Sequence, residues 1–200
     1  MMIYFGNKYP LSSINRLVID GEEVERVRSY KLLGVIINDC LTWENHVLYI
    51  IGKASKRIYC ISQLTRAGIN LKDIILVYTS VIRSVLEYCC QVWHPGLTRR
   101  QSDDIERVQK RCLRILLPHL SYADALLLCR LERLDARREK LTRELFEEFK
   151  NPNHILHNLL TFNSSISNVK LRSVYPYNIP HFNCNRPYKS FINYCLHKKY

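Results

Sequence analysis

The sequence predicts an α+β protein that is mainly α-helical, and three observations support this fold class. Within residues 1–41, short apolar segments alternate with turn residues, as is typical of β-hairpins. Within residues 42–150, apolar residues recur at spacings of three and four, as in a bundle of amphipathic helices. Residues 151–200 contain no Asp or Glu and show no sustained period, which indicates a short packed segment near residues 155–162 and then an irregular, extended basic tail.

The charge balance favours a polyanionic partner. The 200 residues include 30 Lys and Arg against 18 Asp and Glu, a formal net charge of +12. Nucleic acid, as an RNA/DNA duplex or as single strands, is the commonest partner of such a surface. A membrane is the alternative, but no uninterrupted apolar run approaches the ~18 residues of a spanning helix, so we expect no membrane association.

Cysteine usage predicts a reducing compartment. The chain has eight cysteines. Most lie within helical patterns, where we expect small buried apolar residues rather than disulfides; these are Cys60, Cys89, Cys90, Cys112 and Cys129. The start, Met1 to Gly6, has no basic leader and too short an apolar run for a signal peptide. We therefore expect an intracellular protein, nuclear or cytoplasmic, and not a secreted one.

The expected strands lie before residue 41. Asp20-Gly21 separates Val18-Ile19 from the alternating segment 23–27, which predicts a β-hairpin. Segment 30–37 (YKLLGVII) predicts one buried strand interrupted by Gly34, since a glycine inside a strand often marks a bulge or the close approach of another backbone.

Two long helices are expected next. An apolar stripe from Val47 to Ile61 predicts the first, which Gly68 should end, and Asn70 should cap the second. The stripe of the second helix runs from Leu71 to Trp93, about six turns, which predicts one central, well-buried helix that Pro95-Gly96 ends.

A capping box at Thr98 and Gln101 predicts a third long helix with one apolar and one basic side. The residues expected in the core are Ile105, Val108, Cys112 and Ile115. Those expected on the other side are Arg107, Lys110, Arg111 and Arg114, partly neutralised because Glu106 can pair with Lys110. A short helix should begin at residues 121–124, and a longer one should span residues 134–149.

The usual catalytic signatures are missing from the sequence: there is no phosphate-binding glycine loop, no His-Glu-x-x-His and no Gly-x-Ser-x-Gly. Asp103-Asp104 lies in the first turns of a predicted helix, where the acids favour the helix dipole and Asp103 can pair with Arg107, so we expect no metal ligation there. Two loosely spaced sets of possible zinc ligands are better explained as core or solvent positions; they are Cys90, His94, Cys112 and His119, and His181, Cys184, Cys195 and His197.

Basic residues are the best functional signal in the composition. Four cations within about two turns of the third helix can face one row of phosphates, although a solvated helix face is the alternative. The candidate nucleic-acid-binding residues are Lys53, Lys56, Arg57, Arg107, Lys110, Arg111 and Arg114. Aromatic residues of the tail could stack on bases, or the tail could be a disordered end without a partner; they are Tyr175, Tyr177, Tyr188 and Tyr194.

A series of short segments extends this interpretation. They are YKLLGV (30–35), LTWENH (41–46), IRSVLEY (82–88), VWHP (92–95), IERVQKR (105–111), LDARR (134–138) and YKSFI (188–192). In order and spacing, from about residue 1 to 192, they resemble the C-terminal part of the reverse transcriptases of non-LTR (LINE-type, jockey-like) retrotransposons. One such motif would be weak, whereas the ordered set is specific.

The resemblance implies roles for particular residues. Leu33 and Gly34 correspond to the primer grip, a hairpin that holds the 3′ end of the primer, and a glycine there would let a sugar-phosphate approach the backbone. Residues 42–150 correspond to the thumb, a helical bundle that closes on the template-primer duplex through its backbone.

The resemblance also implies that this chain is not an enzyme. The catalytic aspartates of the family lie upstream of the segment that Met1 to Phe5 resembles, so we expect no cofactor, with Mg²⁺ needed only by the complete parent enzyme. Residues 1–41 would then be a palm remnant, whose strands would have an unpaired edge. Alternatives are a helical protein-interaction module, a polymerase completed by a separate palm and fingers portion, and the inert product of a degenerate gene copy.

Overall fold

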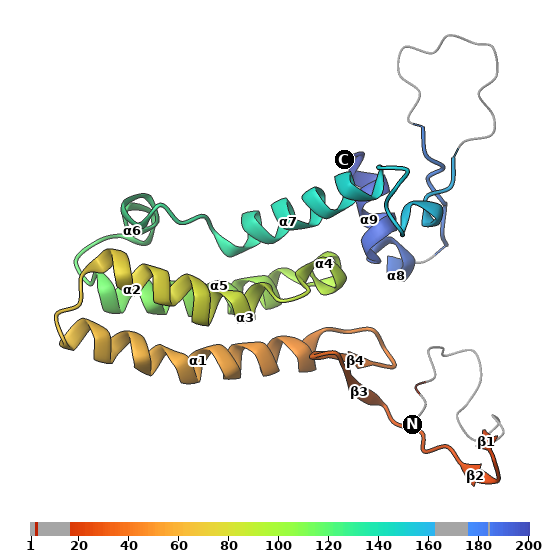
Figure 1. The fold of residues 1–200 in the computed structure, drawn as a ribbon, viewed down its shortest axis with the longest axis horizontal. Coiled ribbons are helices and arrows are strands. Elements are labelled where there is room, and N and C mark those ends of the chain that lie inside the picture. Colours follow the sequence, from red (N-terminus) through yellow and green to blue (C-terminus); the bar gives the residue numbers. More distant parts are fainter. Residues whose placement is uncertain (1–2, 4–16, 163–175, 184) are drawn as a thin grey trace.

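Two small antiparallel hairpins precede a helical bundle in the computed structural model, which describes residues 3, 17–162, 176–183 and 185–200 (Figure 1). In the described part, strands pair only within each hairpin, β1 with β2 and β3 with β4. The strands are β1 (Val18–Ile19), β2 (Glu22–Glu23), β3 (Ser29–Leu32) and β4 (Val35–Asn38). The predicted α+β, mainly α class with hairpins before a multi-helix region is confirmed.

The first hairpin turns at Asp20-Gly21, as predicted. Both residues have positive φ, 52° and 85°, which matches the twist that a two-residue hairpin turn requires. Val18 then pairs with Glu23, and Ile19 with Glu22.

The second hairpin corrects the prediction of one buried strand over residues 30–37. The chain reverses at Leu33 (φ 46°) and Gly34 (φ 88°), because two successive positive φ values turn the backbone instead of extending it. All four residues of β3 are exposed, and in β4 only Val35 is buried. The glycine therefore marks a turn.

Most of the chain between residues 44 and 149 is helical. The long helices are α1 (Glu44–Arg66), α5 (Arg99–Leu116) and α7 (Leu134–Phe149). The shorter segments between them are α2 (Leu71–Val77), the π-helical η2 (Tyr78–Arg83), α3 (Ser84–Glu87), α4 (Cys90–Trp93), the 3₁₀-helical η3 (His94–Gly96) and α6 (Tyr122–Cys129). In the described residues no helix is long and apolar enough to cross a membrane.

Helix ends follow the predicted capping residues. Gly68 follows α1 with φ 71°, and the side chain of Asn70 accepts a hydrogen bond from Asp73 N at the start of α2. Ser121 caps α6 in the same way, through Asp124 N. The predicted bounds of α7, residues 134–149, are those observed.

The predicted continuous helix from Leu71 to Trp93 is wrong. The chain widens to a π-helix at η2 and then breaks at Tyr88 (ψ 123°) and Cys89 (φ 50°). The break leaves the carbonyl of Tyr88 without a helical partner, and Trp93 Nε1 donates to it at 3.0 Å. The apolar periodicity of the sequence continues through this break and therefore does not reveal it. Only the tertiary contacts of Tyr88 and Trp93 explain the break.

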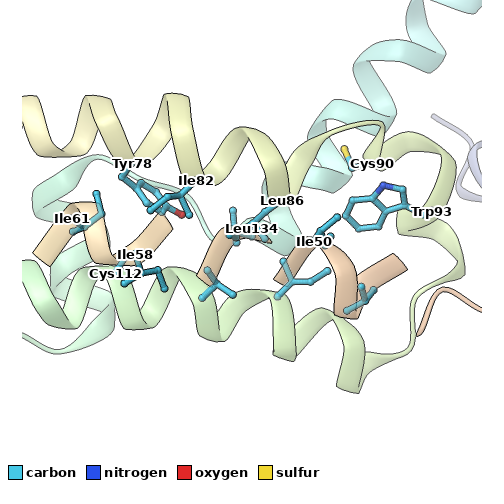
Figure 2. Packing of buried hydrophobic residues seen from close by; sticks show 14 of the residues in the cluster. Ile50, Ile58, Ile61, Tyr78, Ile82, Leu86, Cys90, Trp93, Cys112 and Leu134 are labelled. Atoms are coloured by element: carbon cyan, nitrogen blue, oxygen red, sulfur yellow. The ribbon is translucent and has the colours of Figure 1, made fainter. Parts of the chain in front are cut away.

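The main core lies where α1, the α2–η2–α3 segment and α5 meet. Figure 2 shows Ile50, Ile58 and Ile61 of α1 among side chains of the two other segments, including Tyr78 and Cys112. Leu134, at the start of α7, closes the core with no exposed surface. Burial of these apolar side chains stabilises the helices as one bundle.

The cysteines are free thiols in the described part of the chain, but not all are buried as predicted. Cys90 and Cys112 are buried, Cys89 and Cys129 are half-buried, and Cys60 is exposed. Cys60 lies outside the buried stripe of α1, so its place within a helical pattern did not determine its burial.

The C-terminal region corrects the prediction of an extended tail. Two helices follow η4 (His157–Leu159); α9 (Phe191–Lys198) packs against α7, and α8 (Asn185–Tyr188) packs against α9. A second apolar cluster joins α7 to this region and consists of Phe146, Phe149, Leu160, Tyr177, Cys195 and Leu196. The expected packed segment is only partly packed, because Ile155 is 88% exposed. Tyr175 and Cys184 lie outside the described residues.

Candidate nucleic-acid interface

The basic face belongs to α5, whose first turn is attached to α1. Thr98 N donates to Gln101 Oε1 at 2.8 Å, and Gln101 N donates to Thr98 Oγ1 at 3.3 Å, so the predicted capping box forms. Gln101 Nε2 also donates to Glu44 Oε2 of α1 at 3.0 Å. These bonds fix the start of α5 and its rotation against α1, and therefore which residues face outward.

The predicted division of α5 into two faces is confirmed. Ile105, Val108 and Cys112 are buried, while Ile115 is half-buried. All four of the predicted outward-facing cations are exposed; they are Arg107, Lys110, Arg111 and Arg114. Residues spaced by three and four are neighbours on a helix surface, so the four side chains form one continuous basic strip.

The expected pairing of Glu106 with Lys110 is wrong. Glu106 is only 2% exposed, and it accepts hydrogen bonds from Leu134 N at 2.9 Å and from the hydroxyl of Tyr122. A carboxylate at the N-terminus of α7 is favoured by the helix dipole and satisfies a backbone donor that would otherwise be free. Glu106 thus joins α5 to α6 and α7 and does not neutralise the basic strip.

Among the described residues, Asp104 is the acid that forms an ion pair with the strip. It pairs with Arg107, and its Oδ2 lies 4.0 Å from Arg100 Nε, so the expected pair of Asp103 with Arg107 is wrong. Arg111 and Arg114 form no salt bridge with any residue in the described ranges. Three of the four cations therefore remain available to an external anion, since Lys110 also has no acidic partner there.

A groove runs beside the strip, between α5, the following loop and α6. Its volume is about 850 Å³. All four cations line it, and its other walls are mainly apolar, with Ser121 and Tyr122 as the uncharged polar residues. No acidic residue lines it. A positively charged concave surface without counter-charges concentrates anions, because the low-dielectric walls focus the field.

Tyr122 is held as a fixed wall of this groove. Its hydroxyl donates to Glu106 and accepts from Gln109 Nε2 at 2.9 Å, and Gln109 in turn accepts from the hydroxyl of Tyr78 at 2.6 Å. Burial, together with the bond to Glu106, raises the pKa of Tyr122, so the phenol stays neutral. Lys110 Nζ lies 5.2 Å from the centre of the ring, within cation–π range.

Leu33 and Gly34 form the tip of the second hairpin, and Leu33 is 83% exposed. The hydroxyl of Tyr88, from the helix break, donates to Leu33 O at 2.9 Å. A Cβ on Gly34 would lie 3.2 Å from Cε1 of Tyr88, tighter than an ordinary contact. A glycine is required here both for φ 88° and to admit the Tyr88 ring.

The structure does not bring the hairpin tip and the basic strip together. The hairpin contacts the first turns of α1, where Ile36 N donates to His46 Nδ1 at 3.3 Å and Lys31 Nζ donates to the hydroxyl of Tyr49 at 2.8 Å. The α6 groove lies toward the other end of the bundle (Figure 1). Helix α1 has 23 residues, which corresponds to ~35 Å of helix between the two regions.

The three basic candidates of α1 have different surroundings. Lys53 is exposed and lines a small pocket beside the hairpin tip, and Lys56 is exposed one turn further on. Arg57 is half-buried, and its Nη1 donates to Val81 O in η2 at 2.5 Å. That bond attaches α1 to the π-helical segment and occupies part of the donor capacity of Arg57.

No group of three His, Cys, Asp or Glu side chains that could hold a metal ion occurs among the residues that the structure describes. Of the candidate zinc ligands, His94 Nε2 lies 2.8 Å from Glu139 Oε2 instead, and Cys90, Cys112 and Cys195 are buried thiols whose pKa burial raises to about 12. Such thiols are protonated near neutral pH, whereas metal ligation needs the thiolate.

Sequence reasoning missed several residues of these surfaces. Tyr122 lines the basic groove, and Lys31, Tyr49 and Tyr88 line the pocket at the hairpin tip. Tyr122 directly follows the recognisable cap Ser121, but only tertiary packing turns it toward Lys110. Of the tail tyrosines proposed to stack on bases, Tyr177 is buried and Tyr194 bonds to Glu139.

No protein-family model, curated protein or solved structure matches this chain.

Proposed function

We propose that this chain binds nucleic acid through the groove between α5 and α6, without sequence preference, as the thumb-like part of a non-LTR retrotransposon reverse transcriptase. The observation that supports it best is the row of four exposed cations along a groove without an acidic lining residue. Arginines bind phosphate oxygens with two parallel hydrogen bonds, and contacts of this kind position a duplex without reading its sequence.

In this proposal the chain itself does not polymerise nucleotides. The resemblance of its ordered motifs implies that the catalytic aspartates, and the Mg²⁺ that they hold, belong to a separate palm and fingers portion of the parent enzyme. The chain would act inside the cell, in the nucleus or cytoplasm, either alone or in association with that portion. Leu33 and Gly34 at the exposed hairpin tip would be its primer-grip-like contact.

Binding of a fluorescent RNA/DNA hybrid, followed by anisotropy at several salt concentrations, tests the proposal. Arg111→Glu with Arg114→Glu should weaken binding by roughly tenfold or more and reduce the log–log salt slope by about two, one unit for each lost phosphate contact. The matched control is Arg143→Glu with Lys199→Glu. It changes the charge equally, at two exposed positions outside the groove, and should bind nearly as the native chain does.

Equal weakening by both double variants would mean that only net charge matters and would reject the groove as the site. Failure of the native chain to bind hybrid, duplex or single strands at low salt would reject the function itself.

A second candidate function is docking of a partner helix, and α6 favours it. Leu127 and Leu128 are 78% and 58% exposed on this helix. A partner bound there should be lost in Leu127→Ser but kept in Arg111→Glu, whereas nucleic acid should show the reverse.

A further inference from the structure

A small pocket lies at the opposite end of the bundle from the groove, between the tip of the second hairpin, α1 and α3. Its volume is about 360 Å³. The residues on which its chemistry depends are Lys31, Tyr49, Ile50, Lys53, Val85 and Tyr88. This volume is near the lower end of ligand pockets, which span ~300–1,000 Å³, so it suits one compact group rather than a strand.

Aromatic and aliphatic side chains provide most of the walls. Ile50 is buried, Val85 is half-buried, and the rings of Tyr49 and Tyr88 complete the lining from α1 and from the helix break. Flat apolar walls with ring edges favour a planar aromatic ligand, because ring contacts add to the burial of apolar area.

Two lysines line the same pocket. Lys31 Nζ lies 2.8 Å from the hydroxyl of Tyr49 and 4.5 Å from the centre of its ring, so Tyr49 holds this lysine at the pocket. Its hydrogen bond lowers the pKa of the Tyr49 hydroxyl. Lys53 lies one turn after Tyr49 on α1, and no acidic residue lines the pocket. The ligand should therefore carry negative charge.

Two unusual backbone positions allow Tyr88 to form one wall of the pocket. The helix break turns Tyr88 toward the hairpin, and its hydroxyl bonds to Leu33 O. Gly34 leaves room for the ring, since a Cβ there would meet it at 3.2 Å. The pocket is thus largely preformed, which reduces the entropic cost of binding.

We infer that this pocket binds one unpaired nucleotide: a planar base against the tyrosine-lined walls, with its phosphate at Lys31 and Lys53. The inference deepens the primer-grip-like contact that the proposed function gives to this hairpin tip, because Gly34 lines the pocket, but it does not rest on the α5–α6 groove. The nucleotide could be a free mononucleotide or one unpaired residue of a nucleic-acid strand, which share this chemistry.

Isothermal titration of the full chain with AMP, adenosine and inorganic phosphate tests the inference. AMP should bind roughly tenfold or more tightly than either fragment, because only AMP offers both ring and charge. Lys53→Glu should weaken AMP binding at least about tenfold, whereas Lys72→Glu, an equal charge change at an exposed position outside the pocket, should not. Ser84→Trp, from an exposed position, should fill the pocket and abolish binding without unfolding the chain.

Competition identifies the source of the nucleotide. If a single-stranded oligonucleotide displaces AMP, and Lys53→Glu prevents this, the pocket takes a residue of a strand; if it does not displace AMP, the ligand is a free nucleotide. Equal AMP affinity in the Lys53 and Lys72 variants, AMP binding no tighter than phosphate, or no AMP binding would overturn the inference. Arg111→Glu with Arg114→Glu should leave AMP binding intact, so failure of the groove and failure of the pocket are distinguishable.

Discussion

The cations of α5 and those of α7 have opposite surroundings, although both helices carry runs of basic residues. On α5, Arg111 and Arg114 are exposed beside a groove. On α7, Arg138 is 0% exposed and donates to Ser102 Oγ at 2.8 Å, and Arg137 lies 2.7 Å from Glu87. The first pair can meet an external anion, and the second pair holds helices together. A count of basic residues therefore overstates the binding surface.

The surroundings of Arg138 define a partly buried polar region that we call the Trp93 cluster: Trp93, His46, His94, Arg138, Glu139 and Tyr194. Arg138 lies 5.8 Å from the Trp93 ring, and His46 lies 5.4 Å from it. Glu139 links His94 to Tyr194 of α9. This cluster joins α1, α4, α7 and α9, so its polar groups should affect stability more than those of the groove.

The largest expected difference is in Arg138→Ala, which should lower the free energy of unfolding by about 3–5 kcal/mol. The change empties a buried volume and leaves Ser102 without its partner. Arg138→Met keeps most of the apolar stem and should lose clearly less. Urea unfolding followed by circular dichroism measures both, and equal losses in the two variants would show that packing at this position matters little.

The next effect concerns the pH dependence of stability. Burial lowers the pKa of His46 to about 4, from 6.5. The folded state therefore holds this imidazole neutral, and its contribution is complete above pH 6.5. It is lost as the pH falls from 6.5 toward 4, by about 3 kcal/mol at most.

Unfolding free energies between pH 7.5 and 4 test this in the native chain and in His46→Gln, which has an amide oxygen to accept from Ile36 N but does not titrate. The slope over this interval should be shallower in the variant. An unchanged slope would assign the acid sensitivity to other groups.

A smaller effect is expected where α9 meets α7. Tyr194 donates to Glu139 Oε2 at 2.7 Å, and Tyr194→Phe should cost about 1–2 kcal/mol. Burial by itself raises the pKa of Glu139, but the bonds from His94 and Tyr194 outweigh it and lower the pKa. That stabilisation is present above the ordinary carboxyl pKa and is lost as the pH falls below it, so the variant should lose less stability in acid. In Tyr194→Phe, backbone hydrogen exchange should become faster in α9 than in α1. An equal change in both helices would contradict a local role of Tyr194.

The smallest effect is expected in Arg111→Ala, within about 0.5 kcal/mol of the native stability, because an exposed side chain without an ion-pair partner in the described region contributes little to folding. The same variant should weaken binding of the RNA/DNA hybrid severalfold. A large loss of stability in Arg111→Ala would contradict the difference between the cations of α5 and those of α7.

Sequence by itself determined the local features of this protein. The turn at Asp20-Gly21, the capping box of Thr98 and Gln101, and the bounds of α7 each depend on residues within a few positions of one another. Backbone conformations and hydrogen bonds of such short range act before distant segments meet, so residue type and spacing suffice to predict them.

Only the tertiary structure decided which polar groups remain available. Glu106 turns inward to Leu134 N, and Tyr88 leaves its helix to reach Leu33, although nothing in their local patterns distinguishes them from exposed neighbours. The helices of residues 185–198 were not predicted from the sequence, because α9 depends on its packing against α7. A buried polar group is stabilised by partners distant in sequence, and an amphipathic helix by the surface it covers; neither partner is specified by local periodicity.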